Sequence, residues 1–480
     1  MKKKATFISL IALLFVLLTG TFLVVLIQVR ANAMGQADET KEEKPIDITM
    51  FSAYTDIEEF QSVPVMETEN GKIEDPVDYG SKNYVVNVGG STVEEYQAYL
   101  KTLEQAGFTK HSDNGEDGME GYAYSAGFTK DKLTVVVSHA IHLDRTYISV
   151  GYDVPLSDYM IKGDLQSQNA NAKPKTKLHM LELHDNGNSF IIELKNGHFV
   201  VHDGGQYLDT PYFLDYIEEL TPGDEKPVIE AWFISHAHSD HTGVIHHIAR
   251  DPALINRIYV EGIYYVEPSA KAFELLTMGS GFETNLVTSR VNLAFKSTDG
   301  TPPEMYRPMY GQRYYFSDLT IDVTLTMEQL PESSYYSNDF NDTSTWLMHH
   351  IEGQRILIAG DTYHTGIRVA MQMYDEKYFD LDVYAVFHHG INVVDEFTDY
   401  CTYKTVLYTA FRTASIWEPS RTTLANVAQN EKLRQSCEEY VSHGDGTVVL
   451  TFPYKVGEYK IMEPCDWRYD GGVKKTTIRK

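Results

Sequence analysis

The chain has 480 residues, 42% of them hydrophobic and 23% charged, which allows two ordinary domains and excludes a chain that is disordered throughout. Its formal net charge of −27 disfavours a general nucleic-acid-binding surface, because lysine and arginine supply most of that affinity. Three cysteines, Cys401, Cys437 and Cys465, are too few for a disulfide framework and lack the spacing of a metal site, although one bridge stays open.

The N-terminal segment is predicted to be a membrane anchor. Residues 1–4 contain three lysines and are expected to be a cytoplasmic tail, because positive charge favours that side. Residues 5–29 are an uncharged apolar run that is long enough to be a transmembrane helix. Residues 30–45, small and charged, are typical of a spacer. We therefore expect a single-pass protein of the cell membrane with an extracytoplasmic catalytic domain; cleavage near residues 31–33 is the alternative.

A small α+β accessory domain is predicted over residues 46–159. Residues 84–88 alternate like a strand. Thr92 is a good N-cap for an amphipathic helix over residues 93–106, and Gly107 suits its C-terminus. No pairing of a nucleophile with a base occurs in this region, so we predict a binding or positioning role.

Two more strands are predicted in this domain, over residues 133–138 and 146–152. His139 and His142 flank a strand end, and we expect both at the surface. Residues 160–177 are polar and rich in Asn, Gln and Lys, which is typical of a linker between domains. A larger domain then follows over residues 178–455, and residues 456–480 form a C-terminal tail.

The larger domain begins with predicted strands. Residues 179–183 and 189–194 are separated by residues 185–188, Asp-Asn-Gly-Asn, which is a strong hairpin signal. A third strand over residues 198–202 leads to Asp203, which two glycines follow.

The most informative stretch is residues 230–250, EAWFISHAHSDHTGVIHHIAR. An apolar strand ends in a turn that contains four polar groups, and a helical pattern follows. Imidazoles and carboxylates on one turn can converge on one point, and they are ligands that zinc prefers. We therefore predict a metal site formed by His236, His238, Asp240 and His241.

Two later strands also end in polar groups. Residues 355–359 lead to Asp361, and residues 381–387 lead to the pair His388-His389. Together with SHAHSDHTG, these endings resemble the motifs of the metallo-β-lactamase fold superfamily, in the family's order. The resemblance implies an α/β (α+β) fold, namely a four-layer αββα sandwich of two sheets faced by helices, with the metals at the sheet edge.

The resemblance also implies roles for individual residues. Two metals are expected, one on His236 and His238 and one on Asp240 and His241, with Asp361 bridging them. Asp203 is expected to orient a ligand histidine. The expected ligand of the later pair is His389, while His388 contacts substrate phosphate or protonates the leaving group; the reverse order stays open.

The sequence departs from the family pattern at one ligand. Many members supply a further histidine, but this chain has no histidine from residue 248 to 348. His349 and His350 are expected inside a strand and are poor substitutes. An Asp ligand such as Asp339 or Asp342, or a single weakly held metal, stays open. In this respect the chain is most similar to the C-terminal hydrolase domain of DNA-uptake competence proteins.

We therefore expect a membrane-anchored, metal-dependent hydrolase of phosphodiester bonds in nucleic acid or in an envelope polymer. Zinc is the expected cofactor, as one or two ions, with manganese as the alternative. The attacking species would be metal-bound hydroxide, oriented by Asp240 as a catalytic residue. The alternatives are a hydrolase of lactones, thioesters or β-lactams, and a non-catalytic binding protein with a degenerate metal site. The expected partners are the membrane and a phosphate-bearing or small-molecule substrate, without a basic nucleic-acid-binding surface.

Overall fold

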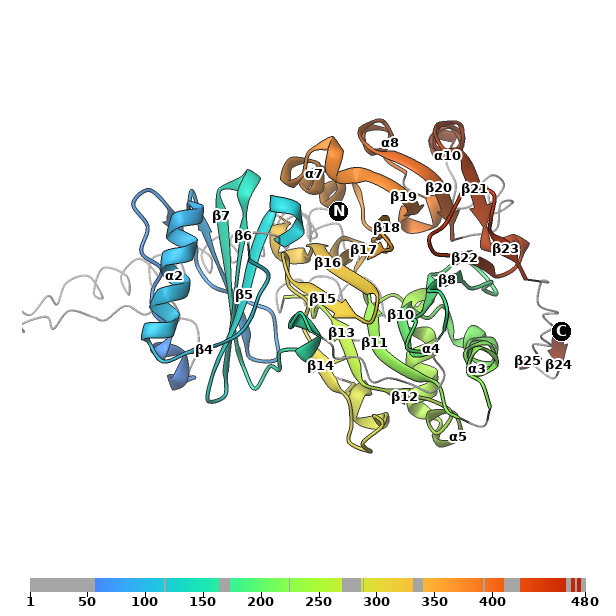
Figure 1. Ribbon diagram of the computed structural model, residues 1–480, viewed down its shortest axis with the longest axis horizontal. Coiled ribbons are helices and arrows are strands. Elements are labelled where there is room, and N and C mark those ends of the chain that lie inside the picture. The colour runs from blue at the N-terminus through green and yellow to red at the C-terminus, as the bar shows by residue number, and fades with distance from the viewer. Residues whose placement is uncertain are drawn as a thin grey trace, which may run out of the picture. The chain divides into compact units, whose positions relative to one another are not determined.

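Three large β-sheets with helices against them make up most of the described chain (Figure 1). The predicted anchor and spacer lie outside the described residues, and no helix within the described residues is long and apolar enough to cross a bilayer. The domain boundaries stay predictions, since Thr49–Lys480 forms one compact unit. The computed structural model describes residues 57–462 except 116–117, 164–172, 224, 270–285, 288, 331–339, 392 and 410–423, and also describes 468–470 and 473–475.

The first sheet is seven-stranded, with the order β1-β3-β7-β6-β5-β4, and β2 pairs with β3. Helix α2 (Val93–Gln105) packs on one face of this sheet through Tyr96, Tyr99, Leu100 and Leu103. The strands are β1 (Lys72–Ile73), β2 (Val77–Asp78), β3 (Asn83–Gly89), β4 (Thr109–Asp113), β5 (Ala123–Lys130), β6 (Leu133–Ala140) and β7 (Arg145–Tyr152).

The predicted helix of this layer is confirmed to within one residue. It starts at a capping box in which the side chain of Thr92 accepts a hydrogen bond from the backbone of Glu95 and the side chain of Glu95 accepts one from the backbone of Thr92. The prediction for His139 is wrong, because its side chain is buried on β6 and bonds Thr146 at 2.9 Å. His142 is exposed, as predicted.

Two further sheets face each other in the larger part of the chain. The first has nine strands in the order β14-β13-β11-β10-β9-β8-β22-β23, with β12 beside β11. Its strands are β8 (Lys177–Met180), β9 (Ser189–Glu193), β10 (Phe199–Asp203), β11 (Val228–Ile234), β12 (Tyr259–Val260), β13 (Gly262–Tyr265), β14 (Glu304–Tyr306), β22 (Val448–Thr451) and β23 (Lys460–Ile461).

The second facing sheet has seven strands in consecutive order from β15 to β21. They are β15 (Arg313–Phe316), β16 (Leu319–Leu325), β17 (Trp346–Ile351), β18 (Gln354–Ile358), β19 (Asp380–Ala385), β20 (Thr402–Tyr408) and β21 (Glu439–Ser442). A separate two-stranded sheet, β24 (Arg468–Asp470) and β25 (Val473–Lys475), belongs to the predicted tail.

An apolar core fills the space between the two facing sheets. Phe190, Ile192 and Phe233 from the nine-stranded sheet share one buried cluster with Ile321 and Ile356 from the seven-stranded sheet. Every residue of β9 and β10 is buried, as expected for strands covered on both faces.

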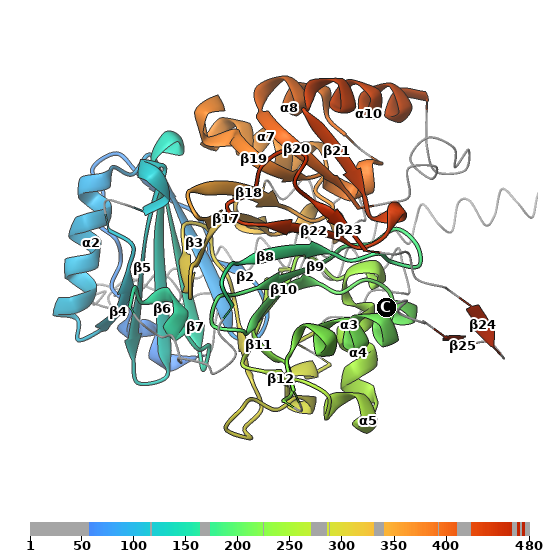
Figure 2. The ribbon, with the colours of Figure 1, turned by 45° about the vertical axis from the view of Figure 1, so that its right-hand side comes forward.

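Helices cover the outer faces of these two sheets (Figures 1 and 2). The result is a mixed α+β protein with several sheets, consistent with the predicted sandwich. On the nine-stranded sheet lie α3 (Thr210–Leu220), α4 (Ser239–Arg250) and α5 (Pro252–Ile255); on the seven-stranded sheet lie α7 (His364–Met373), α8 (Asp395–Tyr400) and α10 (Leu424–Ser436).

Two further predictions from the sequence concern His349 and the cysteines. His349 lies inside β17, as predicted, and its Nε2 atom lies 2.7 Å from Nε2 of His202 on β10, so this histidine joins the two sheets. Cys401 and Cys437 are free thiols, and Cys465 lies outside the described residues.

Candidate metal centre

The polar motifs meet because several parallel strands end at one edge of the facing sheets. Strand β10 runs parallel to β11, and β18, β19 and β20 run parallel to one another. Polar residues lie at the carboxyl end of each: Asp203 ends β10, His236 follows β11, Asp361 follows β18, His388 follows β19 and Thr409 follows β20. Such an edge is where α/β proteins place their binding sites.

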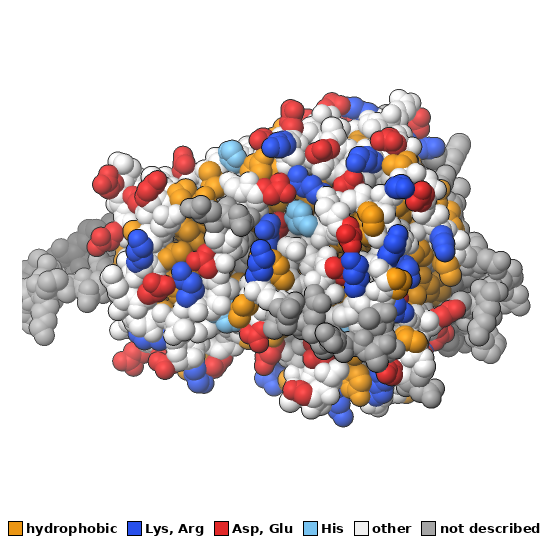
Figure 3. Space-filling model, viewed as in Figure 1, with side chains coloured by type: hydrophobic (Ala, Val, Ile, Leu, Met, Phe, Trp, Pro, Cys, Tyr) orange, Lys and Arg blue, Asp and Glu red, His pale blue; other side chains and the backbone are white. Residues whose placement is uncertain are grey.

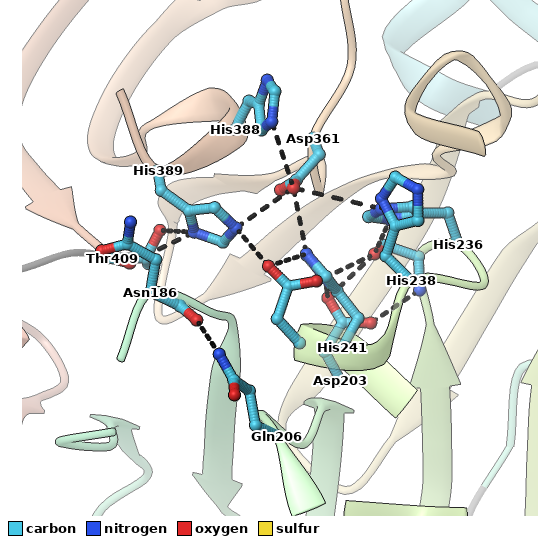
Figure 4. Close-up of polar contacts among 12 residues, drawn as sticks. Asn186, Asp203, Gln206, His236, His238, His241, Asp361, His388, His389 and Thr409 are labelled. Carbon is cyan, nitrogen blue, oxygen red and sulfur yellow. Dashed lines mark hydrogen bonds and ion pairs between the residues drawn. The ribbon is translucent and has the colours of Figure 1, made fainter. Parts of the chain in front are cut away.

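One group of ligand-type atoms comes from Asp240, His241, Asp361 and His389, all within 4.8 Å of one another. Figure 4 labels the last three of these residues. Nε2 of His241 and Nε2 of His389 each lie 3.1 Å from Oδ2 of Asp361. Nε2 of His389 lies 3.2 Å from Oδ2 of Asp240. Two imidazoles and two carboxylates therefore surround one point.

A second group consists of His236, His238 and Asp361. Nε2 of His236 lies 3.0 Å from Nδ1 of His238 and 4.0 Å from Oδ2 of Asp361. The carboxylate of Asp361 thus belongs to both groups, as a bridging ligand must. The structure brings together all six residues for which the sequence predicts metal ligation.

The donor atoms fit a divalent cation. Nε2 of His241, Nε2 of His389 and Oδ1 of Asp361 are buried and make no hydrogen bond among the described residues, although both nitrogens lie 3.1 Å from Oδ2 of Asp361. Leaving buried polar atoms without hydrogen bonds costs roughly 1–3 kcal/mol each, which a coordinated cation would offset. Imidazole nitrogen and carboxylate oxygen are the donors that zinc and similar ions accept.

Buried neighbours hold the ring orientations. Nδ1 of His241 lies 2.8 Å from Oδ2 of Asp203, so its Nε2 is left to face the centre. Asp203 also accepts hydrogen bonds from the backbone N–H of Ser235 at 2.8 Å and from its hydroxyl at 2.9 Å. Nδ1 of His389 contacts Thr409 at 3.1 Å from the hydroxyl oxygen and 3.2 Å from the carbonyl oxygen.

Close packing around the centre requires two glycines. A Cβ atom on Gly360 would lie 2.7 Å from Cβ of Ser235, and the residue has a φ of +57°. A Cβ atom on Gly187 would lie 2.7 Å from the carbonyl oxygen of Asp240. The predicted hairpin turn therefore packs on the metal-binding turn, and Asn186 in that turn accepts a hydrogen bond from Gln206 (Figure 4).

Opposite charges dominate the electrostatics of the centre. Burial lowers the pKa of His389, but the carboxylates of Asp361 and Asp240 outweigh it and raise the pKa to about 9. Against the same burial, Asp361 and Asp203 raise the pKa of His241 well above its ordinary value. Burial raises the pKa of Asp361, but His241 and His389 outweigh it and hold that pKa well below its usual range.

His236 behaves differently from the other buried imidazoles. Burial first, and then the neighbouring His241 and His238, lower its pKa well below the ordinary value. A lowered pKa favours the neutral imidazole that binds a metal; at His241 and His389 a bound cation would displace the proton that the neighbouring carboxylates otherwise attract.

His388 lies at the rim rather than inside either group. Its Nε2 is 3.9 Å from Oδ2 of Asp361 and 3.4 Å from Nδ2 of Asn341, and its ring lies beside Tyr363. Its side chain is 13% exposed, against 2% for His389. The two adjacent histidines therefore face different surroundings.

Of the two possible substitute ligands, only Asp342 lies among the described residues, and it is not part of the centre. Asp342 is buried on a short helix, Phe340–Thr343, and belongs to neither group of the described residues. Asp339 lies outside the described residues. The sequence did not predict that Ser235 and Thr409 contact residues of the centre. Ser235 directly precedes His236, which was a local indication of its position. Thr409 has no such indication in the sequence.

Residues 184–392 match the family model described as metallo-beta-lactamase superfamily. This segment contains every residue of the two ligand groups. No curated protein matches the chain.

Solved structures give a distant similarity. A Cronobacter sakazakii metallo-beta-lactamase HARLDQ motif mutant is 15% identical, covering 55% of this chain and 91% of its own, with a TM-score of 0.30. The metallo-beta-lactamase fold protein YhfI from Bacillus subtilis is 10% identical, covering 56% and 96%, with a TM-score of 0.33. Zinc-bound PqqB from Methylobacterium extorquens is 10% identical, covering 42% and 59%, with a TM-score of 0.27. Scores of this size carry no argument about chemistry.

Proposed function

Residues 184–392 belong to the metallo-beta-lactamase superfamily, and from this premise we propose that the protein is a metal-dependent hydrolase of phosphodiester bonds. The observation that carries the proposal is the carboxylate of Asp361, which two ligand groups share. These residues would hold two divalent ions, which would supply positive charge for the oxygens on which negative charge develops during phosphodiester hydrolysis. We propose zinc as the cofactor, with manganese as the alternative. Each of the two groups of ligand-type atoms would bind one ion.

When bound, such ions supply Lewis acidity and bring the pKa of a water molecule toward neutrality. The chain's own residues provide the remaining functions. The side chain of Asp240 is 26% exposed, whereas those of His241 and His389 are 0% and 2% exposed. Asp240 is therefore the group that can accept a hydrogen bond from a water on the open side and orient it.

His388 supplies a proton donor beside the centre. It is the partly exposed member of its pair and lies at the rim, held between Asn341 and Tyr363. From there its Nε2 atom can contact a substrate oxygen or protonate the leaving group. Its neighbour His389 is buried with Nε2 toward both carboxylates and acts as a ligand.

The net negative charge of the chain limits how an anionic substrate can bind. On the face shown in Figure 3, acidic and basic side chains are interspersed. A net charge of −27 also opposes binding of a polyanion through a broad surface. We therefore propose that an anionic substrate binds locally, where the ions provide the positive charge.

Attachment to the cell membrane, through residues 5–29, is part of the same proposal. Fractionation of cells that express the protein with and without this segment tests it.

The experiment combines metal analysis with two substrates. We expect the purified protein to bind two zinc ions and to hydrolyse bis-p-nitrophenyl phosphate rather than a chromogenic β-lactam. Asp240→Asn should lower turnover at least about 100-fold. Asp399→Asn is the matched control, since its side chain is 68% exposed and pairs with Lys432.

The outcomes separate the competing functions. Faster hydrolysis of the β-lactam than of the phosphodiester would replace the proposal with the lactam, lactone or thioester alternative. Protein that binds no metal and hydrolyses neither substrate would leave only a binding protein.

A further inference from the structure

Tyr207 differs from the other aromatic residues in its exposure. Of the large hydrophobic side chains that are exposed in the described part of the chain, it is the only aromatic one, at 55%. Large rings elsewhere, such as those of Trp232 and Tyr264, are buried in the cores. A single exposed hydrophobic residue is ordinary, so its surroundings decide whether it has a function.

The ring of Tyr207 stacks on the imidazole of His247 in helix α4. The two ring centroids lie 3.6 Å apart, and the ring planes differ by 21°. Nδ1 of His247 also lies 3.3 Å from the carbonyl oxygen of Tyr207. The imidazole covers one face of the tyrosine ring, so the exposed area belongs to the opposite face and the ring edge. We call this pair of rings the aromatic platform.

Hydrogen bonds hold the backbone of the platform. The hydroxyl of Thr210 donates to the carbonyl oxygen of Tyr207 at 2.9 Å. The backbone N–H of Gln206 donates to Oδ2 of Asp209 at 2.8 Å, and the backbone N–H of Asp209 donates to the carbonyl oxygen of Gln206 at 2.9 Å. The ring is therefore positioned before a ligand arrives, which reduces the entropy lost on binding.

Helix α4 carries the platform and part of the metal centre on one stripe. Asp240, Gly243, His247 and Arg250 follow one another at spacings of three and four residues, which places them on the same face. All four are at least partly exposed, whereas most other residues of the helix are buried. The open side of Asp240 and the platform therefore face the same way.

The platform lies close to the centre along this helix. A Cβ atom on Gly243 would lie 2.4 Å from the backbone nitrogen of Tyr207, so the segment after β10 contacts the helix there. Gly243 and His247 come three and seven residues after Asp240, which corresponds to about 5 Å and about 10 Å along the helix axis. The sugar of one nucleotide can bridge this separation between a phosphate at the centre and a base on the platform.

The charges near the platform favour an uncharged ring over a second anion. Beyond His247 the helix ends at Arg250, and Asp251 follows directly, so one positive and one negative side chain lie at this end. The carboxylate of Asp251 accepts a hydrogen bond from the backbone N–H of Ala253 at 2.9 Å. Stacking of a neutral base does not depend on these charges, and every base has a face that can stack.

We propose that Tyr207, supported by His247, stacks on the nucleobase of a nucleotide whose phosphodiester lies at the metal centre. A phosphodiester that is one sugar away from a planar ring is the chemistry of a nucleotide, and this identifies the substrate as a nucleic acid or a nucleotide ester. The identification of the substrate rests on the proposed function, whereas the binding of a base to the platform does not.

Binding to the zinc-loaded full chain tests the platform without turnover. Isothermal titration calorimetry compares 2′-deoxyadenosine 5′-phosphate with 2-deoxyribose 5-phosphate, which lacks the base. We expect the nucleotide to bind about tenfold more tightly, because one base stacks on the tyrosine ring. Glucose 6-phosphate, a sugar phosphate without a base, should bind no more tightly than 2-deoxyribose 5-phosphate.

Variants assign the preference for the nucleotide to the platform. Tyr207→Ala should abolish the preference, and Tyr207→Trp should keep it, because the indole also offers a flat ring. His247→Ala should reduce the preference in part, since the tyrosine ring loses its support. Ile161→Ala is the control, because its side chain is 42% exposed and lies in the predicted linker. Circular dichroism checks that each variant is folded.

Turnover gives a second measurement of the same contact. With thymidine 5′-(p-nitrophenyl phosphate), Tyr207→Ala should raise KM about tenfold and leave kcat nearly unchanged, because the base is bound equally in the ground state and the transition state. With methyl p-nitrophenyl phosphate, which has no base, the same variant should leave both constants unchanged.

The outcomes separate this proposal from the proposed function. No preference for the nucleotide, or a preference that persists in folded Tyr207→Ala, overturns the platform even if phosphodiesters are hydrolysed. Tighter binding of glucose 6-phosphate that depends on Tyr207 also overturns it, since the ring would then bind sugars. A preference for the nucleotide that depends on Tyr207, without hydrolysis of either ester, keeps the platform and overturns the proposed function.

Discussion

Oδ2 of Asp203 lies 2.8 Å from Nδ1 of His241, and both side chains are buried. The aspartate comes from the end of β10 and the histidine from the first turn of α4, so the contact joins two motifs that are 38 residues apart. It sets which ring nitrogen carries the proton and directs the other nitrogen to the centre.

The first prediction concerns this contact. Asp203→Asn should weaken zinc affinity about 10- to 100-fold, because the amide no longer fixes the ring as the carboxylate does. Competition with a chromogenic chelator measures the change. Asp399→Asn serves as the control, and unchanged affinity in a folded Asp203→Asn protein would contradict an orienting role for Asp203.

The second prediction separates the shared ligand from an unshared one. Asp361→Asn should lower the occupancy of both metals, since its carboxylate belongs to both ligand groups. Asp240→Asn should lower the occupancy of one, since it belongs to a single group. Elemental analysis after dialysis against limiting zinc counts the ions. Equal loss in the two variants would show that Asp361 does not bridge.

The third prediction compares the adjacent histidines. His389→Gln should reduce metal content, because the ring is buried with Nε2 beside both carboxylates. His388→Gln should keep the metal and lower kcat for bis-p-nitrophenyl phosphate about 100-fold, since it removes only a proton donor at the rim. If His388→Gln loses the metal while His389→Gln retains it, the two roles are reversed.

The fourth prediction concerns stability and pH at Glu193. Its carboxylate is buried on β9; burial raises its pKa, but His179, Lys177 and Lys173 outweigh that effect and lower the pKa to about 2. A lowered folded-state pKa stabilises the protein above the unfolded pKa of about 4.3, and this contribution is lost as the pH falls toward 2. Glu193→Gln should therefore lower the free energy of unfolding by about 3 kcal/mol at pH 7.

Urea denaturation of the wild type and the variant between pH 7 and pH 3 measures that difference. It should shrink once the pH is below about 4.3, where the unfolded-state carboxyl takes up a proton. Glu458→Gln is the control, because its side chain is 65% exposed and its ion pair with Lys455 is 3.9 Å long. A difference that is constant over the whole pH range would assign the effect to packing instead.

Local sequence patterns predicted much of the molecule correctly. The capping box at Thr92 places a helix start because it satisfies backbone donors within four residues. The apolar run before His236 ends as a strand at Ile234, and the polar turn after it leads directly into α4. The local pattern predicted the four polar residues of this turn, and the family resemblance added Asp361 and His389; all six lie in the two groups of ligand-type atoms.

The alternation of polar and apolar residues along a strand did not predict burial where other layers cover both faces of the sheet. His139 lies in a strand whose residues are all buried, and α2, which covers one face of this sheet, places the ring of Tyr96 5.8 Å from the imidazole. A strand alternates between two faces, and the sequence does not disclose that both are covered.

The sequence by itself determined the types of ligand and their order, because the motifs depend on short spacings at strand ends. Only the tertiary structure decided which of them lie in the same group of ligand-type atoms and which neighbours hold them. Thr409 reaches His389 because β20 lies beside β19, and Asp361 joins both groups because β18 ends opposite the turn after β11. Tyr207 likewise stacks on His247, 40 residues later in the chain, because the segment after β10 lies against α4. These contacts arise from strand order and layer packing, which no local spacing encodes.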